Sequence, residues 1–226
     1  MIGRHGPASL NMRTMPTLSE TDSKQLLAAF GVPVVPDRVV SDPDGAQAAA
    51  AHFGGPVAVK LCGPGIAHKT ERNLVRLGVE GDTVRQAATQ LLAAARPEDG
   101  DVGLLVAPMV RGTRELIAGL HRDARFGMTV MLGIGGVLAE ALGDVAFRLV
   151  PLEAVDAAEL IEDLATQSLL GPFRGEPAVD RQALAAVLLG LAAAAGAHPE
   201  IVSADLNPLI VVDGKPVAVD ALVETA

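Results

Sequence analysis

The spacing of apolar residues along this chain changes several times between a helical period and the continuous or alternating pattern of strands. The helical stretches predict helices over residues 19–30, 41–53, 82–96, 154–166 and 180–195. The other apolar stretches predict strands over residues 32–40, 56–61, 75–79, 103–110, 115–120, 128–132, 147–150, 201–212 and 215–223. Helices and antiparallel hairpins therefore follow one another irregularly, which favours an α+β architecture over a doubly wound parallel sheet.

Local signals mark where several of these elements begin and end. Ser19 followed by Asp22 resembles a capping box at the start of the first helix, and Gly31 stops that helix. Ser41 is the expected cap of the second helix, which ends at Gly54. The chain before this region, residues 1–16, has no apolar segment of a secretory signal, and we expect a disordered leader there.

Composition excludes several classes of protein. The 226 residues carry a formal net charge of -9, and Trp and Tyr are absent, so nucleic-acid binding is not expected. The single cysteine, Cys62, rules out a disulfide framework and fits a reducing cytoplasm. The longest apolar run, residues 183–197, is shorter than the roughly 20 residues of a membrane-spanning helix. We therefore expect a cytoplasmic protein that does not enter a membrane.

A glycine-rich loop carries the first group of candidate functional residues. The segment from Gly63 to Thr70 is one residue away from a phosphate-binding P-loop, but His68 stands where that motif needs glycine. A P-loop also opens a helix, whereas residues 75–79 alternate like a strand, so we reject this motif. What remains is a turn between two strands that carries His68 and Lys69, with Lys60 on the preceding strand. Such a local cationic cluster on an acidic chain suits phosphate groups, although a solvated loop is an equal alternative.

The end of the chain predicts a hairpin with polar residues on one face. A two-residue turn at Asp213 and Gly214 would place Asn207 opposite Asp220, with Asp205 on the same face. Carboxylate and amide oxygens suit a hard cation such as Mg²⁺, which commonly also binds nucleotide phosphates. An ordinary polar face is the alternative, and a bulge would shift the register. A further glycine cluster, residues 133–136, matches a dinucleotide fingerprint only weakly because Leu138 replaces its last glycine, and we interpret it as a tight turn.

Taken in order, a set of short motifs resembles one known family, the ATP-grasp β subunit of ADP-forming acyl-CoA synthetases such as acetate–CoA ligase. The motifs are Ser19-Glu20 with Lys24 and Leu27, Phe30-Gly31-Val32-Pro33, Gly55-Pro56-Val57-Ala58-Val59-Lys60, His68-Lys69-Thr70-Glu71, Pro108-Met109-Val110, Glu115-Leu116-Ile117-Ala118-Gly119, Phe126-Gly127, Gly133-Ile134-Gly135-Gly136, Arg174-Gly175 and Asp205-Leu206-Asn207-Pro208-Leu209. They span residues 17 to about 224, and their ordered combination is specific although no single motif is.

The resemblance implies an ATP-grasp fold in residues 17–226, with two α+β lobes that bind nucleotide between them. We expect the small lobe over about residues 17–102 and the larger lobe over about residues 103–226. The implied reaction is the reversible conversion of acyl-CoA, ADP and phosphate into carboxylate, CoA and ATP. The CoA-binding α subunit would be a separate chain in a hetero-oligomer, and it would hold the acyl substrate and a phosphohistidine.

The resemblance also assigns residues to roles. Lys60 and Lys69 would bind the phosphates of ATP or ADP, residues Ala107, Met109 and Val110 would meet the adenine edge, and Glu115 matches the acidic position that follows. Asn207 and Asp220 would hold Mg²⁺, in agreement with the hairpin argument. His68 matches a loop histidine that relays the phosphoryl group, for which an imidazole nitrogen is a competent acceptor.

Three positions depart from the family pattern. Asn73 stands near a usual glycine, Ala107 replaces a frequent glutamine, and Ser203 replaces a frequent glutamate. These departures motivate an alternative, a nucleotide-sensing or structural subunit without turnover. A stand-alone ATP-grasp carboxylate–amine ligase is the other alternative. The acyl substrate, the choice of ADP or GDP and the oligomeric state are not encoded in any motif of the chain.

Overall fold

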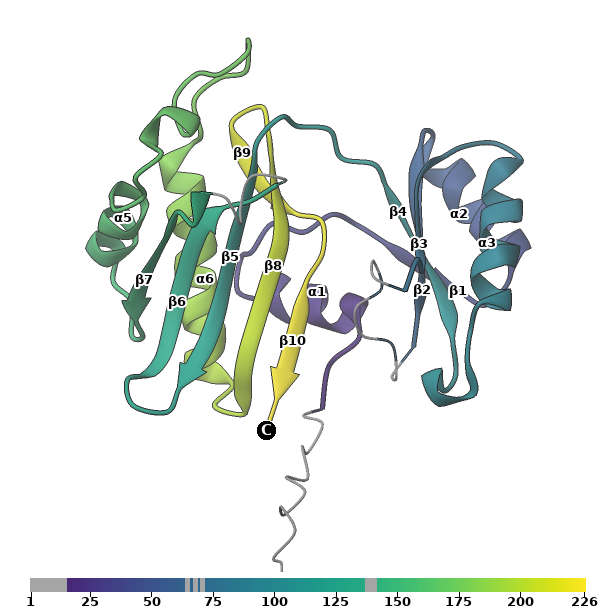
Figure 1. Cartoon of the computed structure of the whole chain (residues 1–226), viewed down its shortest axis with the longest axis horizontal. Coiled ribbons are helices and arrows are strands. Elements are labelled where there is room, and N and C mark those ends of the chain that lie inside the picture. Colours follow the sequence, from purple (N-terminus) through teal and green to yellow (C-terminus); the bar gives the residue numbers. More distant parts are fainter. Residues whose placement is uncertain (1–15, 64–65, 67–68, 70–71, 137–141) are drawn as a thin grey trace, which may run out of the picture.

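The computed structural model describes residues 16–63, 66, 69, 72–136 and 142–226, which form two lobes side by side (Figure 1). Each lobe is an antiparallel sheet with helices packed on one face. The leader predicted for residues 1–16 lies outside the described residues except for Pro16. No helix in the described part of the chain is long and apolar enough to cross a membrane.

The small lobe contains a four-stranded sheet with two helices on one face. In spatial order the strands are β1 (Arg38–Val40), β4 (Gly103–Pro108), β2 (Val57–Cys62) and β3 (Val75–Val79). The helices are α2 (Pro43–Phe53) and α3 (Thr83–Ala93), and a short 3-10 helix η1 (Pro97–Asp99) leads into β4. The side chain of Asp42, not of the predicted Ser41, caps α2 by accepting from the Gly45 N–H at 2.8 Å. The strand β3 directly after the glycine-rich loop agrees with our rejection of a P-loop.

The lobe boundary differs from the predicted one because β4 belongs to the small lobe. This strand lies between β1 and β2 and is buried on both faces. Leu104 and Val106 pack toward the helices, while Leu105 and Ala107 face the other lobe. Residues 115–120, which form the next strand along the chain, belong to the sheet of the other lobe and do not pair with β4. A central strand needs apolar residues on both faces, and the sequence pattern alone does not say which sheet it joins.

The larger lobe is built on a six-stranded sheet. Its strands run in the order β10 (Leu222–Thr225), β8 (Ile201–Val212), β5 (Glu115–Asp123), β6 (Gly127–Ile134) and β7 (Val145–Leu149), and β9 (Lys215–Ala218) pairs with β8. The helices are α1 (Glu20–Ala28), α5 (Ala154–Glu162) and α6 (Arg181–Ala197), with a 3-10 turn η2 (Gln167–Leu169). Although α1 precedes the small lobe in the sequence, Leu27 lies in the core of the larger lobe. The Ser19 cap of α1 is confirmed, since Ser19 Oγ accepts from the Asp22 N–H at 3.1 Å.

The C-terminal hairpin has the predicted register. Val212 pairs with Lys215 across the turn, in which Asp213 and Gly214 both have positive φ. The same register continues to the far end, where Leu222 pairs with Asp205. The predicted strand 215–223 is nevertheless two strands, with residues 219–221 between β9 and β10. Pro208 on the facing strand has no N–H to donate, so the ladder cannot be complete at this point.

The packing of α6 against the end of α1 gives a test of the fold. A Cβ atom added at Gly190 would lie 2.7 Å from the Phe30 carbonyl oxygen and 3.1 Å from a Val32 methyl group. We expect Gly190→Ala to lower the free energy of unfolding by about 1–3 kcal/mol, because backbone must move to admit the methyl group. Gly196→Ala in the same helix has open space and should be neutral or stabilising by up to about 1 kcal/mol. Urea unfolding of both variants checks this, and equal effects would contradict the described contact.

Candidate functional site

A buried cluster of ion pairs joins the two lobes. Lys60 on β2 donates from Nζ to Glu20 Oε1 at 2.6 Å and to Asp220 Oδ2 at 3.0 Å. Lys69 Nζ donates to the other oxygen of Glu20 at 2.5 Å. Lys24 Nζ lies 3.0 Å from Glu20 Oε1 and 3.2 Å from Asp37 Oδ2. The two lysines of the small lobe are therefore held by carboxylates of the larger lobe.

The local structure explains how these side chains meet. Side chains on β2 alternate, so Val59 and Leu61 face α2 and α3 while Lys60 points out of the small lobe toward the larger one. Glu20 is the first residue of α1, and its side chain is fully buried. Asp220 lies in the break between β9 and β10. The interruption of the hairpin thus coincides with the residue that contacts Lys60.

The charges of the cluster follow from these contacts. Burial alone would raise the pKa of Glu20, but Lys60, Lys69 and Lys24 together lower this pKa to about 2. Burial opposes the charge of Lys60, yet Glu20 and Asp220 outweigh it and raise the Lys60 pKa. For Asp220, burial and the nearby Glu20 carboxylate raise the pKa despite the contact with Lys60. The Lys60 ammonium is thus stabilised in its charged form. For Asp220, the nearby lysines do not fully offset the effects of burial and of Glu20.

The hairpin offers oxygen ligands for a divalent cation. Burial and then repulsion from Asp220 raise the pKa of Asp205, so two carboxylates compete for positive charge here. Asn207 lies opposite Asp220 in the register of the hairpin, and its side chain is exposed. Within the described residues no three histidine, cysteine or acidic side chains gather closely enough to hold a metal alone. The donor set fits Mg²⁺, which completes its coordination with water and phosphate oxygens.

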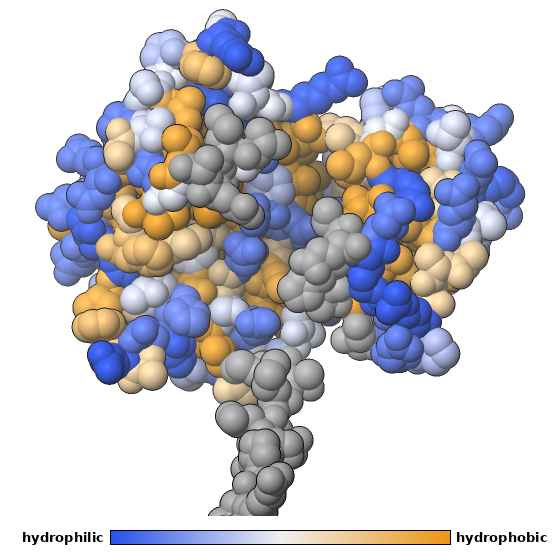
Figure 2. Space-filling model, viewed as in Figure 1, coloured by the Kyte–Doolittle hydropathy of each residue, from blue (hydrophilic) through white to orange (hydrophobic). Residues whose placement is uncertain are grey.

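A small apolar cluster lies beside Lys60 between the lobes. Val35, Leu105 and Ala107 form it, with Val110, Val217 and Val219 packed against them. Lys60 pairs with Leu105 across the sheet, so the cluster and the charged group are adjacent. Figure 2 shows a furrow between the lobes in which apolar and polar side chains are both exposed. Such a surface suits a ligand with a flat apolar part and a charged part.

The predicted adenine-contacting residues lie at the edge of this cluster. Ala107 is buried in β4 opposite Ala58, and the Met109 N–H donates to the Pro56 carbonyl oxygen at 2.9 Å. Ala107 and Val110 belong to the cluster. The Met109 N–H is already paired, so a base would have to meet the backbone of this segment at another group.

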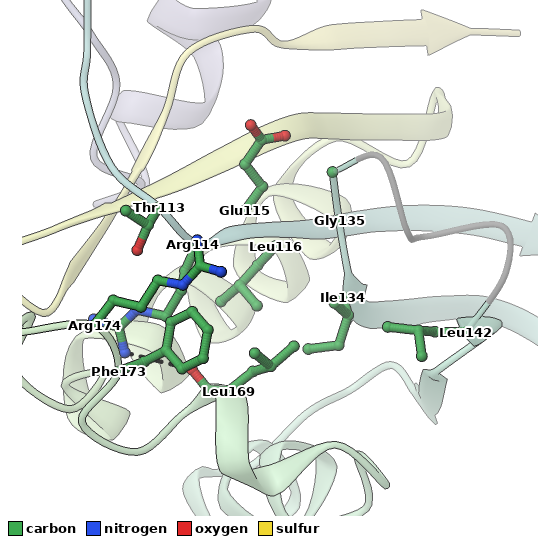
Figure 3. A pocket seen from close by; sticks show the side chains of 11 residues that line it. Thr113, Arg114, Glu115, Leu116, Ile134, Gly135, Leu142, Leu169, Phe173 and Arg174 are labelled. Atoms are coloured by element: carbon green, nitrogen blue, oxygen red, sulfur yellow. Dashed lines mark hydrogen bonds between the residues drawn. The ribbon is translucent and has the colours of Figure 1, made fainter.

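Glu115 lies at a different place, at the mouth of a pocket of about 340 Å³ in the larger lobe. Figure 3 shows its carboxylate directed away from Leu116, which lies with Ile134 and Leu169 on the apolar side of the pocket. The Glu115 carbonyl oxygen accepts from the Gly135 N–H at 2.8 Å, which ties the glycine cluster to β5. The structure does not place Glu115 in contact with the lysine cluster.

The remaining predicted residues have different outcomes. His68 lies outside the described residues, whereas Lys69 after it is part of the charged cluster. Asn73 adopts the left-handed conformation with φ 56°, which asparagine tolerates better than most residues. Ser203 donates to Glu224 Oε2 at 2.6 Å, so a carboxylate is present beside it on β10.

Glu20 was not predicted as a functional residue, because an acidic residue after Ser19 is common at helix starts.

Known proteins are similar to this chain over most of its length. A model of the ATP-grasp domain family matches residues 11–225. The β subunit of ADP-forming acetate–CoA ligase I from Pyrococcus furiosus is 34% identical over 208 residues, which cover 90% of each chain. The β subunit of ligase II from that organism is 33% identical, with 85% of this chain and 84% of the relative covered.

A solved structure gives the same result. Acetyl-coenzyme A synthetase 1 of Ca. Korarchaeum cryptofilum, solved with coenzyme A and Ca-AMPCP, is 31% identical with a TM-score of 0.86. The match covers 97% of this chain and 96% of that one. The same synthetase has been solved with Mg-AMPPCP and its phosphohistidine segment pointing towards the nucleotide binding site. The chain described here therefore belongs to the ATP-grasp family, in the branch formed by the β subunits of ADP-forming acyl-CoA ligases.

Proposed function

We propose that this chain is the nucleotide-binding subunit of an ADP-forming acyl-CoA synthetase. It would transfer a phosphoryl group between a phosphohistidine and ADP in the reversible conversion of acyl-CoA, ADP and phosphate to carboxylate, CoA and ATP. The observation that carries the proposal is the contact of Lys60 with Asp220 across the two lobes, 3.0 Å apart. This contact brings a cation that can bind phosphate next to a carboxylate that can bind a metal, and both lie beside the apolar cluster.

The residues of the cluster have separate roles in this proposal. Lys60 and Lys69 bind phosphate oxygens and offset the charge on the transferring group, which is most of what phosphoryl transfer requires of a protein. Asp220 and Asn207 would hold Mg²⁺, which would supply positive charge to offset that of the phosphates. The apolar residues around Ala107 and Val110 accept the base. His68 would take the phosphoryl group on an imidazole nitrogen and pass it on.

A second chain is required for the complete reaction. Two relatives that match this chain along most of their length are named as β subunits, which denotes a protein that works with another subunit. We propose that the partner is a CoA-binding α subunit and that the two form a hetero-oligomer. Relatives named for acetate, 4-hydroxybutyrate and ferulate share this domain, so we place the choice of acid in the partner. The single cysteine supports a cytoplasmic location.

Thioester formation tests the proposal. The chain is mixed with its purified α subunit, CoA, Mg²⁺, ATP and a panel of carboxylic acids, and acyl-CoA is measured. We expect ATP-dependent acyl-CoA with at least one acid, and none when either chain is left out. Nucleotide binding without thioester from any acid would support a sensing subunit instead. Product from this chain and an amine in place of CoA would support a stand-alone ligase.

The metal assignment gives a separate prediction. Asp220→Asn removes the carboxylate charge but keeps an oxygen, so the affinity for Mg²⁺-ADP should fall by about 10–100-fold. Affinity for ADP without the metal should change by less than about threefold. Titration calorimetry at several Mg²⁺ concentrations measures both. Asp213→Asn, in the exposed turn of the same hairpin, is the matched control and should bind as the unmodified chain does. Unaltered metal dependence in Asp220→Asn would contradict the assignment.

A further inference from the structure

We propose that Glu20 is a positioning residue for phosphoryl transfer, which holds Lys60 and Lys69 together at the place where the phosphates bind. The inference rests on the proposed function, and it assigns a role to a residue of α1 that this function does not otherwise use. Glu20 acts through the two lysines: one carboxylate oxygen accepts from Lys60 at 2.6 Å and the other accepts from Lys69 at 2.5 Å.

The geometry requires an anchor of this kind. Lys60 lies on a rigid strand, but Lys69 lies in the loop between β2 and β3, and both belong to the small lobe. Two ammonium groups close together repel each other unless an anion lies between them. Glu20 supplies that anion from the larger lobe, on the first turn of a capped helix. It therefore sets the position of the loop lysine relative to the strand lysine and the position of both relative to the larger lobe.

Charge balance separates Glu20 from the rest of the cluster. Lys24, the third lysine on Glu20, is also paired with Asp37, so Glu20 is not needed to neutralise it. Asp220 pairs with Lys60 here but is the proposed metal ligand. Once Asp220 binds metal, Glu20 is the remaining carboxylate on Lys60 among the contacts described. Glu20 and the two lysines then carry one net positive charge, and this charge faces the phosphates.

The structure gives a reason to assign a functional role and not only a stabilising one. Buried ion pairs contribute little net stability, because desolvation offsets most of the attraction. A fully buried carboxylate with three lysines is thus a costly way to hold two lobes. If Glu20 serves alignment, its loss should slow the transfer step more than it weakens ADP binding, because removing its charge makes the site more attractive to phosphate.

The test compares Glu20→Gln and Glu20→Asp with the unmodified chain, each combined with the α subunit. We expect Glu20→Gln to lower kcat by about 10–100-fold, as the loss of one charge-assisted hydrogen bond to an aligned lysine implies. The Kd for ADP should stay within about threefold. Glu20→Asp keeps the charge but is too short to reach both lysines, and it should lower kcat several-fold with Kd unchanged. Asp37→Asn, whose carboxylate contacts Lys24 and Thr21, is the matched control and should keep both values.

A double-mutant cycle identifies the route of the effect. In a Lys69→Met background, Glu20→Gln should change kcat much less than it does alone, because the aligned lysine is already gone. Equal and additive losses would overturn the proposal, as would a Glu20→Asp variant with normal kcat. A parallel fall in kcat and ADP affinity would indicate a structural role and also overturn it. Should Glu20→Gln not fold, Glu20→Asp decides alone. Failure of the unmodified chain to bind ADP would instead overturn the proposed function.

Discussion

Replacing Lys60 with methionine is expected to lower the affinity for ADP by about 100-fold and to remove measurable thioester synthesis. The side chain keeps its length and apolar stem but loses the cation that faces Asp220 and the phosphates. A charge-assisted hydrogen bond to phosphate accounts for about 1.5–3 kcal/mol, and transfer depends on it further. Titration calorimetry with ADP and an acyl-CoA assay with the α subunit measure the two effects.

The variant should also fold, which makes the result interpretable. Glu20 retains Lys24 and Lys69 as partners, and Asp220, which loses its ion pair with Lys60, has a side chain that is 36% exposed to solvent. The matched control is Lys215→Met at the exposed start of β9, which should keep affinity and rate. Normal ADP affinity in a folded Lys60→Met chain would show that the phosphates bind elsewhere.

Replacing His68 with alanine is expected to lower thioester synthesis by roughly a thousandfold or more, because a covalent carrier of the phosphoryl group would be lost. The affinity for ADP should change by less than about threefold, since Lys60 and Asp220 remain. His68→Ala should therefore lower the rate and leave the affinity for ADP, whereas Lys60→Met should lower both. The role of His68 rests on the resemblance of its loop to that of the family, because His68 lies outside the described residues.

Labelling provides a direct readout for the same variant. The chain is mixed with the α subunit and with ATP that is radioactively labelled at its γ-phosphate. The label should accumulate on the unmodified chain and be absent from the His68→Ala variant. His52→Ala is the matched control, since His52 is an exposed histidine at the end of α2 in the same lobe. Full activity of His68→Ala would remove the relay, and the phosphoryl group would then pass directly between nucleotide and partner.

Local signals predicted much of the fold. The turn at Asp213 and Gly214 fixes the register of β8 with both β9 and β10, because a two-residue turn leaves one pairing. Ser19 identifies the start of α1 by the hydrogen bond that its hydroxyl accepts. His68 in place of glycine excluded a P-loop, and β3 follows as a strand. In each case the physical cause lies within a few residues.

Other features depend on contacts between distant segments and are not visible in local patterns. Residues 103–108 read as a buried strand, but only pairing with β1 and β2 places them in the small lobe. Glu20 is 40 residues from Lys60 and 49 from Lys69, and as an acid in a first helical turn it looks like an ordinary cap. Lys60 and Asp220 were linked in advance by resemblance to a family, whereas their contact across 160 residues is a property of the fold.

A crystal structure of the chain with ADP and Mg²⁺ tests the central claim most directly. The claim predicts the terminal phosphate within hydrogen-bonding distance of Lys60 Nζ, the metal bound to Asp220, and the base beside Ala107 and Val110. A nucleotide bound instead in the pocket near Leu116 and Ile134, with Lys60 still paired to Asp220, would contradict it.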